Sequence, residues 1–291
     1  MAKLISIANM KGGVGKTTTS VALAKAFATA EGGGNALLVD LDAQANASFW
    51  VCGDAALTAL IEKGETIDAF LEDAVVFGKP VALKDYIHPA VNGPANLSVI
   101  PSSPWLRVIE RELIVFLSRR QRSLLEVERV VSDLFNAQVR EIAPSFDFVI
   151  FDTAPGMSAL NEAALRASDL IVIPTVPDFI SNLGLEAFCK TVHWSNKEGM
   201  RKPWVVANMV KGTVHHRLML EEMRAEAAAD DGGYKMFETQ VPNETWIEEA
   251  ASDAEGEGAR KLTGAEGNPF SALAAEIRQI LARATPVAAA S

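Results

Sequence analysis

Two lysines and three glycines lie within one short stretch, Lys11–Thr19, and together could bind a phosphate group. Glycines let the backbone turn so tightly that consecutive N–H groups, together with the positive end of a following helix, face one anion. Lys16 would then reach the terminal phosphates, and the hydroxyl of Thr17 would hold Mg²⁺. Without an anion between them the two lysines would repel each other. We therefore expect a phosphate-binding loop rather than a solvated turn.

Two acids follow the next apolar segment of the chain. Asn35–Leu41 is predicted to be a buried strand, and it delivers Asp40 and Asp42. Carboxylates at the carboxyl end of a parallel strand lie at the mouth of the crevice where ligands bind. The alternative is a capped helix start, because Asp42 and Asn46 both suit such positions.

A third candidate is the hydrophobic segment Phe146–Phe151, which ends in the acid Asp152. This is the Walker B pattern, in which the final carboxylate holds the Mg²⁺ shell, usually through water. A strand-terminal aspartate alone says little. With a phosphate loop upstream and Thr153–Gly156 directly after it, it predicts a metal-binding acid.

The elements around these residues predict the fold class. An apolar strand precedes the loop and a helix from Val21 to Ala30 follows it, and the same alternation continues along the chain. This order argues for an α/β fold with a mostly parallel central sheet and helices on both faces. We expect one domain over residues 1–284 and a frayed tail over 285–291. Further strands are expected at 97–101, 170–174 and 204–208, and further helices over 106–142, 178–196 and 269–283.

The glycine-rich loop departs from the ordinary Walker A pattern. The usual pattern has a glycine five residues before Gly15, where this chain has Met10, and here the additional Lys11 appears. The spacing resembles the deviant Walker A loop of the ParA/MinD family of P-loop NTPases, and the segment from Asp40 to Asn46 resembles the motif after the second strand of ParA proteins. The family more often has proline where this chain has Ala154, a departure that could change the stiffness of the switch.

That resemblance implies roles for individual residues. It implies that Lys11 reaches the partner's nucleotide across a dimer, that Lys16 grips phosphate and that Asp40 positions the attacking water. Thr17 and Asp152 would hold Mg²⁺, and Asn208 and Pro242 would contact adenine. The implied nucleotide-binding residues are Lys11, Gly12, Gly13, Val14, Gly15, Lys16, Thr17, Thr18, Asn208 and Pro242.

The resemblance also implies a function. It implies an Mg²⁺-dependent ATPase that forms a homodimer around two ATP molecules, releases on hydrolysis, and partitions plasmid or chromosomal DNA or positions other large cargo. A ParB-like or cargo-adaptor protein would stimulate hydrolysis, and the protein would be cytoplasmic and associated with the nucleoid. The chain resembles the short form, which has no N-terminal helix-turn-helix extension.

Charge is distributed unevenly along the chain. The net charge is −10, yet residues 225–258 contain ten acids and one base, so the remainder is close to neutral. From Lys190 to Arg224 there are seven bases and three acids. We therefore expect binding to DNA without sequence preference, with Arg217 and Arg224 on one face of a helix as the contacts.

Other function classes remain less favoured. No run approaches the ~20 apolar residues of a spanning helix, the N-terminus leads directly into the first strand, and the tail is not a basic amphipathic helix. We therefore expect no membrane partner, which disfavours a MinD-like positioning ATPase. An iron–sulfur scaffold would need paired cysteines, whereas Cys52 and Cys189 are far apart. A metabolic ATP-dependent ligase stays open, because residues 51–94 could contribute to a small-molecule pocket.

Overall fold

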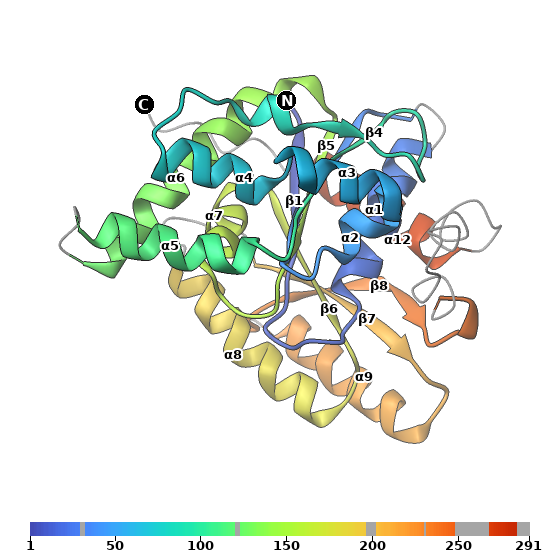
Figure 1. The fold of residues 1–291 in the computed structure, drawn as a ribbon. Coiled ribbons are helices and arrows are strands. Elements are labelled where there is room, and N and C mark those ends of the chain that lie inside the picture. The colour runs from blue at the N-terminus through green and yellow to red at the C-terminus, as the bar shows by residue number, and fades with distance from the viewer. Residues whose placement is uncertain (30–32, 120–122, 196–201, 230, 248–267, 284–291) are drawn as a thin grey trace.

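The chain folds around one eight-stranded sheet whose order is β3-β4-β2-β5-β1-β6-β7-β8 (Figure 1). This computed structural model describes residues 1–29, 33–119, 123–195, 202–229, 231–247 and 268–283. Neighbouring strands are parallel except for β3, which pairs antiparallel to β4. The strands are β1 Lys3–Ile7, β2 Ala36–Leu41, β3 His88–Pro89, β4 Leu97–Ile100, β5 Phe148–Thr153, β6 Leu170–Thr175, β7 Trp204–Val210 and β8 Lys235–Pro242.

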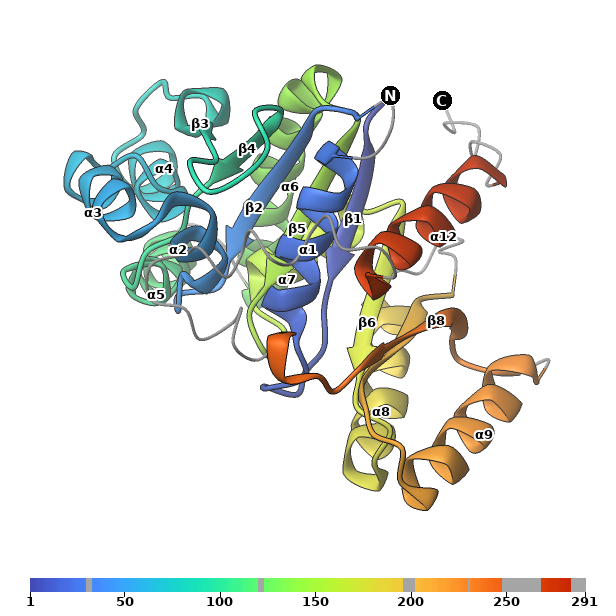
Figure 2. The same cartoon turned by 90° about the vertical axis from the view of Figure 1, so that its right-hand side faces the viewer.

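Helices cover both faces of the sheet, as parallel strands require. One apolar core joins the sheet to α1, α2, α3 and α12, and two others join its opposite face to α4–α9. Figure 2 shows α1 and α12 in front of the sheet. The helices are α1 Lys16–Thr29, α2 Asn46–Cys52, α3 Asp54–Lys63, α4 Ile67–Leu71, α5 Leu106–Ser118, α6 Leu124–Ile142, α7 Ala159–Ala167, α8 Phe179–Ser195, α9 Val214–Ala228 and α12 Pro269–Arg283.

The central strands are buried on both sides. Every residue of β2, β5 and β6 is buried, so these strands read as continuous apolar runs rather than as an alternating pattern. On the α1 side, the ring of Phe27 stacks on that of Phe148 with centroids 4.1 Å apart. This packing fixes α1 against the sheet, and α1 carries the glycine-rich loop at its N-terminus.

The predicted α/β fold with a mostly parallel sheet is confirmed. The helix after the glycine-rich loop begins at Lys16, five residues earlier than expected, because the end of the loop is itself the first turn. The predicted helical stretch 106–142 is two helices, α5 and α6. Neither the short β3 nor β8 was predicted. The expected tail, 285–291, lies outside the described residues. None of the described helices is both long and apolar enough to cross a membrane.

Candidate functional site

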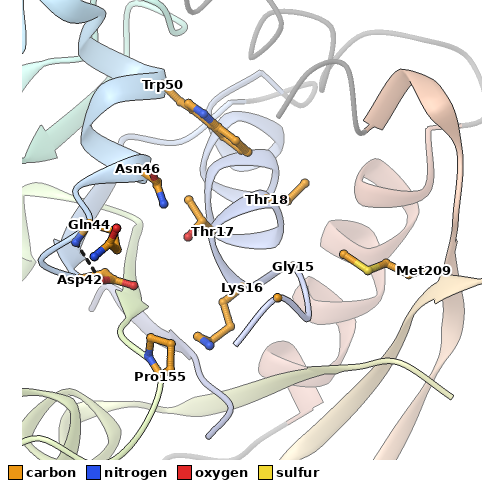
Figure 3. Close-up of a pocket in the computed structure, with 11 residues that line it drawn as sticks. Gly15, Lys16, Thr17, Thr18, Asp42, Gln44, Asn46, Trp50, Pro155 and Met209 are labelled. Atoms are coloured by element: carbon orange, nitrogen blue, oxygen red, sulfur yellow. Dashed lines mark hydrogen bonds between the residues drawn. The ribbon is translucent and has the colours of Figure 1, made fainter. Parts of the chain in front are cut away.

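A pocket of about 420 Å³ opens at the carboxyl-terminal edge of the sheet (Figure 3). It brings together the glycine-rich loop, the segment after β2, the segment after β5 and the end of β7. Its lining residues are Gly13, Gly15, Lys16, Thr17, Thr18, Asp42, Gln44, Asn46, Trp50, Pro155 and Met209. The structure thus joins the three motifs that the sequence analysis singled out.

The glycine-rich loop needs glycine at two of its positions. Gly13 and Gly15 have φ angles of 71° and 85°, a left-handed conformation that other residues adopt at a cost. A Cβ atom on Gly15 would also collide with Nδ2 of Asn208. Gly15 therefore allows β7 to approach the loop closely.

The side chain of Lys16, within the glycine-rich loop, is buried. Its Nζ donates a hydrogen bond to the main-chain carbonyl of Lys11 at 2.9 Å. Burial lowers the pKa of Lys16, and the carboxylates of Asp152 and Asp42 partly oppose that shift. A phosphate group would supply the counter-charge that burial makes necessary.

Lys11 points elsewhere. It does not line the pocket of its own chain. Its Nζ donates a hydrogen bond to the Ser181 hydroxyl at 2.7 Å and lies 3.6 Å from a carboxylate oxygen of Asp178. The side chain is 38% exposed, so its charge is accessible to a second molecule.

Asp152 fits a role in holding a divalent cation. It is fully buried, and its Oδ1 accepts a hydrogen bond from Ser20 at 2.8 Å. Its Oδ2 is buried without a hydrogen-bond partner, although the Thr17 hydroxyl is near enough to favour the ionised form. Burial, reinforced by the charge of Asp40, raises the pKa of Asp152 to about 8. An orphaned carboxylate oxygen beside a threonine hydroxyl suits Mg²⁺, which favours oxygen ligands and keeps several waters.

Protein ligands for that cation would be few. Among the described residues, no three histidine, cysteine, aspartate or glutamate side chains form a metal-binding group. Mg²⁺ is commonly bound through one or two protein ligands together with substrate phosphates. The pair Thr17 and Asp152 is therefore consistent with a cation that arrives with a nucleotide.

Asp40 lies behind the pocket rather than on its wall. Its Oδ1 accepts the Asp42 amide at 3.0 Å, and its Oδ2 accepts both the amide and the hydroxyl of Ser48, at 2.8 and 2.6 Å. Burial raises the pKa of Asp40 to about 6, and these hydrogen bonds oppose the shift. Asp42 lines the pocket and accepts the Gln44 amide at 2.9 Å. Asp40 therefore positions the segment that presents Asp42.

The segment after β5 has its own brace. The side-chain amide of Asn161 in α7 donates hydrogen bonds to the carbonyls of Ala154 and Gly156, both at 3.0 Å. These bonds span Pro155, which lines the pocket. A Cβ atom added at Gly12 would lie 3.9 Å from the proline ring, so the two segments are in contact there. The alanine that replaces the more usual proline at 154 thus lies in a loop that Asn161 holds.

Asn208 and Pro242 are the two residues expected to contact adenine. Asn208 is buried, and its Nδ2 donates a hydrogen bond to the Val14 carbonyl at 2.7 Å. Pro242 ends β8 next to Val210 and is not among the residues that line the pocket. Asn208 thus braces the glycine-rich loop, and adenine contact by either residue stays a prediction.

Two lining residues were missed by the sequence analysis. Trp50 of α2 and Met209 of β7 form walls of the pocket on either side of Thr18 (Figure 3). Met209 has a φ angle of 52°, unusual for a residue with a side chain. No motif marks either residue, because each reaches the pocket only through the packing of its own element.

The two arginines expected to contact DNA lie on α9. Arg217 and Arg224 are exposed, as expected, and their spacing of seven residues places them near one face. The exposed Glu221 lies between them on that same face. Two further bases of the stretch, Lys197 and Arg201, lie outside the described residues.

Comparison with known proteins identifies the family. Residues 2–202 match the model of the AAA_31 family, described as an AAA domain. The chain is 30% identical over 256 residues to the sporulation initiation inhibitor protein Soj of Bacillus subtilis, covering 87% of this chain and 88% of Soj. The chain belongs to the ParA family.

Two other relatives are also similar to this chain. This ParA-family chain is 27% identical over 250 residues to the chromosome partitioning protein ParA of Myxococcus xanthus, covering 86% of this chain and 78% of that protein. It is 31% identical over 196 residues to an uncharacterised protein of Methanocaldococcus jannaschii, where the match spans 65% of this chain and 64% of that protein.

Solved structures share the fold of this ParA-family chain. Apo McdA of Cyanothece superposes with a TM-score of 0.72 at 19% identity, covering 95% of this chain and 100% of McdA. A putative plasmid partition protein of Borrelia burgdorferi bound to AMPPNP gives 0.67 at 17% identity, covering 97% and 99%. Cobyrinic acid a,c-diamide synthase of Mycobacterium smegmatis with bound ADP and magnesium gives 0.68 at 18% identity, covering 97% and 96%.

Proposed function

We propose that this protein is an Mg²⁺-dependent ATPase whose ATP-bound form is a homodimer, and that it acts as a switch in partitioning DNA or positioning another large cargo. The observation that carries the proposal is that the two lysines of the glycine-rich loop point in different directions. Lys16 is buried against the pocket, whereas Lys11 turns out of it toward Ser181. A second lysine in a phosphate loop that does not face its own pocket is available to a nucleotide bound by another subunit.

ATP and Mg²⁺ fit the residues present. The loop would hold the phosphates, Lys16 would compensate their charge, and Thr17 with Asp152 would hold the cation. Structural neighbours bound to AMPPNP, or to ADP and magnesium, support this assignment. The cation would supply electrostatic stabilisation of the phosphates, while the protein's own residues bind and orient them.

A dimer face lies next to Lys11. Three large apolar side chains in the first turns of α8, those of Phe179, Ile180 and Leu183, are exposed to solvent. They belong to the same helix start as Ser181, which holds Lys11. Clustered exposed apolar residues are characteristic of interaction surfaces. Burying them against a second copy would bring Lys11 toward that copy's pocket.

DNA is the scaffold that we propose for the switch. Arg217 and Arg224 support this, and a two-fold dimer would double their number of phosphate contacts. Affinity should fall with salt at a log–log slope of about −0.9 for each phosphate contacted. Glu221 between the two arginines opposes the interaction, so we expect retention of DNA only by the dimer.

The test measures ATP turnover and DNA retention on the same preparations at about 50 mM salt, where phosphate contacts are strong. We expect wild-type protein with ATP and Mg²⁺ to retain duplex DNA, and the Arg217→Glu/Arg224→Glu variant to lose retention while keeping ATP-dependent dimerisation. Arg140→Glu, an exposed charge reversal on α6, is the matched control. If wild-type protein hydrolyses ATP but does not bind DNA, the proposed ATPase activity stands and DNA is not the scaffold.

A further inference from the structure

The outward face of α5 has the composition of a protein-binding surface. Leu106, Ile109, Leu113 and Leu117 point into the core. On the solvent side Trp105, Val108 and Val115 are 61%, 41% and 58% exposed. Interfaces are enriched in tryptophan and arginine. The exposed Arg107, Arg111 and Arg119 lie along the same stretch of chain, as does the exposed Glu112 between the two valines. We name this surface the α5 face: Trp105, Val108 and Val115 with Arg107, Arg111 and Arg119.

The charge of the α5 face indicates the partner's chemistry. Two exposed arginines of α5, Arg107 and Arg111, together with Arg119 directly after it, outnumber the one exposed acid of the helix, Glu112, although the chain as a whole is acidic. A second copy would bring like charges together if it used the same face. Complementarity instead requires carboxylates around an apolar centre.

The start of α5 is joined to Asp40 by hydrogen bonds. The Ser48 hydroxyl, which donates to Asp40, also accepts the main-chain amide of Ser102 at 2.8 Å. The next residue, Ser103, accepts the amide of Trp105 through its hydroxyl at 3.1 Å. One short segment therefore contacts both the network behind the pocket and the first residue of the α5 face.

A second connection runs from the inner side of α5 to the segment after β5. The carboxylate of Glu110 interacts with the Ser158 hydroxyl and lies within electrostatic reach of Asp42. The Ser158 hydroxyl caps α7 by accepting a hydrogen bond from the main-chain amide of Asn161 at 3.3 Å. The side-chain amide of Asn161 in turn holds the loop around Pro155. Displacing α5 would thus act on both segments that flank the pocket. Figure 1 shows α5 reaching from the middle of the molecule toward its edge.

We infer that the α5 face docks an acidic amphipathic segment of a partner protein, and that this docking changes the hydrolysis rate through Ser48 and Ser158. The partner's apolar side chains would cover Trp105, Val108 and Val115, and its carboxylates would pair with the arginines. Docking itself stands on the face alone. Its effect on hydrolysis rests on the proposed function.

The docking test uses a synthetic acidic helix of about 18 residues, five turns, with leucines on one side and glutamates on the other. Titration calorimetry without nucleotide should show saturable binding to wild-type protein. Val108→Glu/Val115→Glu should weaken that binding at least about tenfold, or about 1.4 kcal/mol. Val91→Glu, an equally polar change at an exposed valine of the β3–β4 connection, should leave binding unchanged. Thermal melts should be alike, because these valines are exposed.

A second pair of variants tests the charge. Arg107→Glu/Arg111→Glu should lose the acidic peptide and bind a peptide in which lysines replace the glutamates. A scrambled peptide of the same composition should bind wild-type protein weakly, because it lacks an apolar side. No saturation by about 1 mM of the acidic peptide, or equal binding by the Val108→Glu/Val115→Glu variant or the scrambled peptide, would overturn the proposal. The proposal would also be overturned if the protein bound itself, anionic vesicles or duplex DNA in place of the peptide, and if the Val108→Glu/Val115→Glu variant lost that binding.

The effect on the switch is measured separately. With saturating ATP and Mg²⁺, the peptide should change the single-turnover hydrolysis rate of wild-type protein, whereas Ser48→Ala should bind the peptide and respond less. Peptide binding with no hydrolysis under any condition would count against the proposed function and leave the docking surface standing. Hydrolysis that is indifferent to bound peptide would overturn the coupling.

Discussion

The side-chain amide of Asn208 donates a hydrogen bond to the main-chain carbonyl of Val14 at 2.7 Å, which joins the end of β7 to the glycine-rich loop. The two residues are 194 positions apart in sequence. The loop's conformation therefore depends on a strand far from it in the chain. Gly15 permits the contact because any side chain there would collide with Asn208.

Asn208→Ala should weaken binding of both ATP and inorganic tripolyphosphate by about five- to tenfold, because it leaves the buried Val14 carbonyl without its partner. ATP should lose more than tripolyphosphate if Asn208 also contacts adenine. Calorimetry with both ligands separates the two roles, and Asn243→Ala, which does not line the pocket, is the control. Unchanged tripolyphosphate affinity would show that Asn208 does not brace the loop.

Lys16→Ala should abolish productive ATP binding. Each charge-assisted hydrogen bond from its ammonium to phosphate is worth about 1.5–3 kcal/mol, and the substitution removes all of them. The measurement is a fluorescent-nucleotide titration, with Lys63→Ala, an exposed lysine at the end of α3, as the control. If Lys16→Ala bound the nucleotide with wild-type affinity, the glycine-rich loop would not be the nucleotide-binding site.

Asp40→Ala should leave ATP binding and dimerisation intact while slowing single-turnover hydrolysis at least about tenfold. Phosphoryl transfer depends mainly on positioning and electrostatic stabilisation. The structure places Asp40 where it orients Ser48 and Asp42 rather than in the pocket wall. Ser48→Ala should therefore slow hydrolysis in the same direction by less. If Asp40→Ala hydrolyses ATP at the wild-type rate, Asp42→Asn becomes the variant to measure.

The pH dependence of stability should reveal the buried acid Asp152. Its pKa is raised in the folded protein to about 8, so the folded state binds more protons than the unfolded state between about pH 4 and pH 8. Stability from this group is thus fully present at acid pH and is lost as pH rises toward 8. Without nucleotide or Mg²⁺, Asp152→Asn should be more stable than wild type at pH 8 by at least about 1 kcal/mol.

That advantage should shrink toward pH 4 and should reverse when Mg²⁺ and ATP are added, because only the carboxylate would hold the cation. Thermal melts across this range check the prediction, with Asp133→Asn, an exposed acid of α6, as the control. A destabilised Asp152→Asn at pH 8 in the absence of metal would contradict the raised pKa.

Local sequence was sufficient for part of this site. The loop from Lys11 to Thr19 and the acid Asp152 could be predicted because glycine, lysine and carboxylate at fixed spacing follow apolar strands. Buried parallel strands are also recognisable in the sequence as continuous apolar runs, which made the fold class predictable.

Contacts between distant elements could not be predicted in the same way. The position of Trp50 on the pocket wall depends on how α2 packs against α1. The hydrogen bond from the Ser102 amide to the Ser48 hydroxyl depends on the pairing of β2 with β4. Asp40 was expected to face the pocket, and its burial follows from the Ser48 network that the motif does not encode. The outward turn of Lys11 likewise requires Ser181, 170 residues away.

Light scattering with ATP and Mg²⁺ tests the central claim, that Lys11 serves the partner subunit's nucleotide, most directly. We predict that wild-type protein doubles its mass with ATP and that Lys11→Ala binds ATP with near wild-type affinity but remains a monomer without turnover. Lys16→Ala should also remain a monomer without turnover, but because it does not bind ATP, so the ATP affinity distinguishes the two variants. A Lys11→Ala protein that dimerises and hydrolyses ATP like wild type would contradict the account.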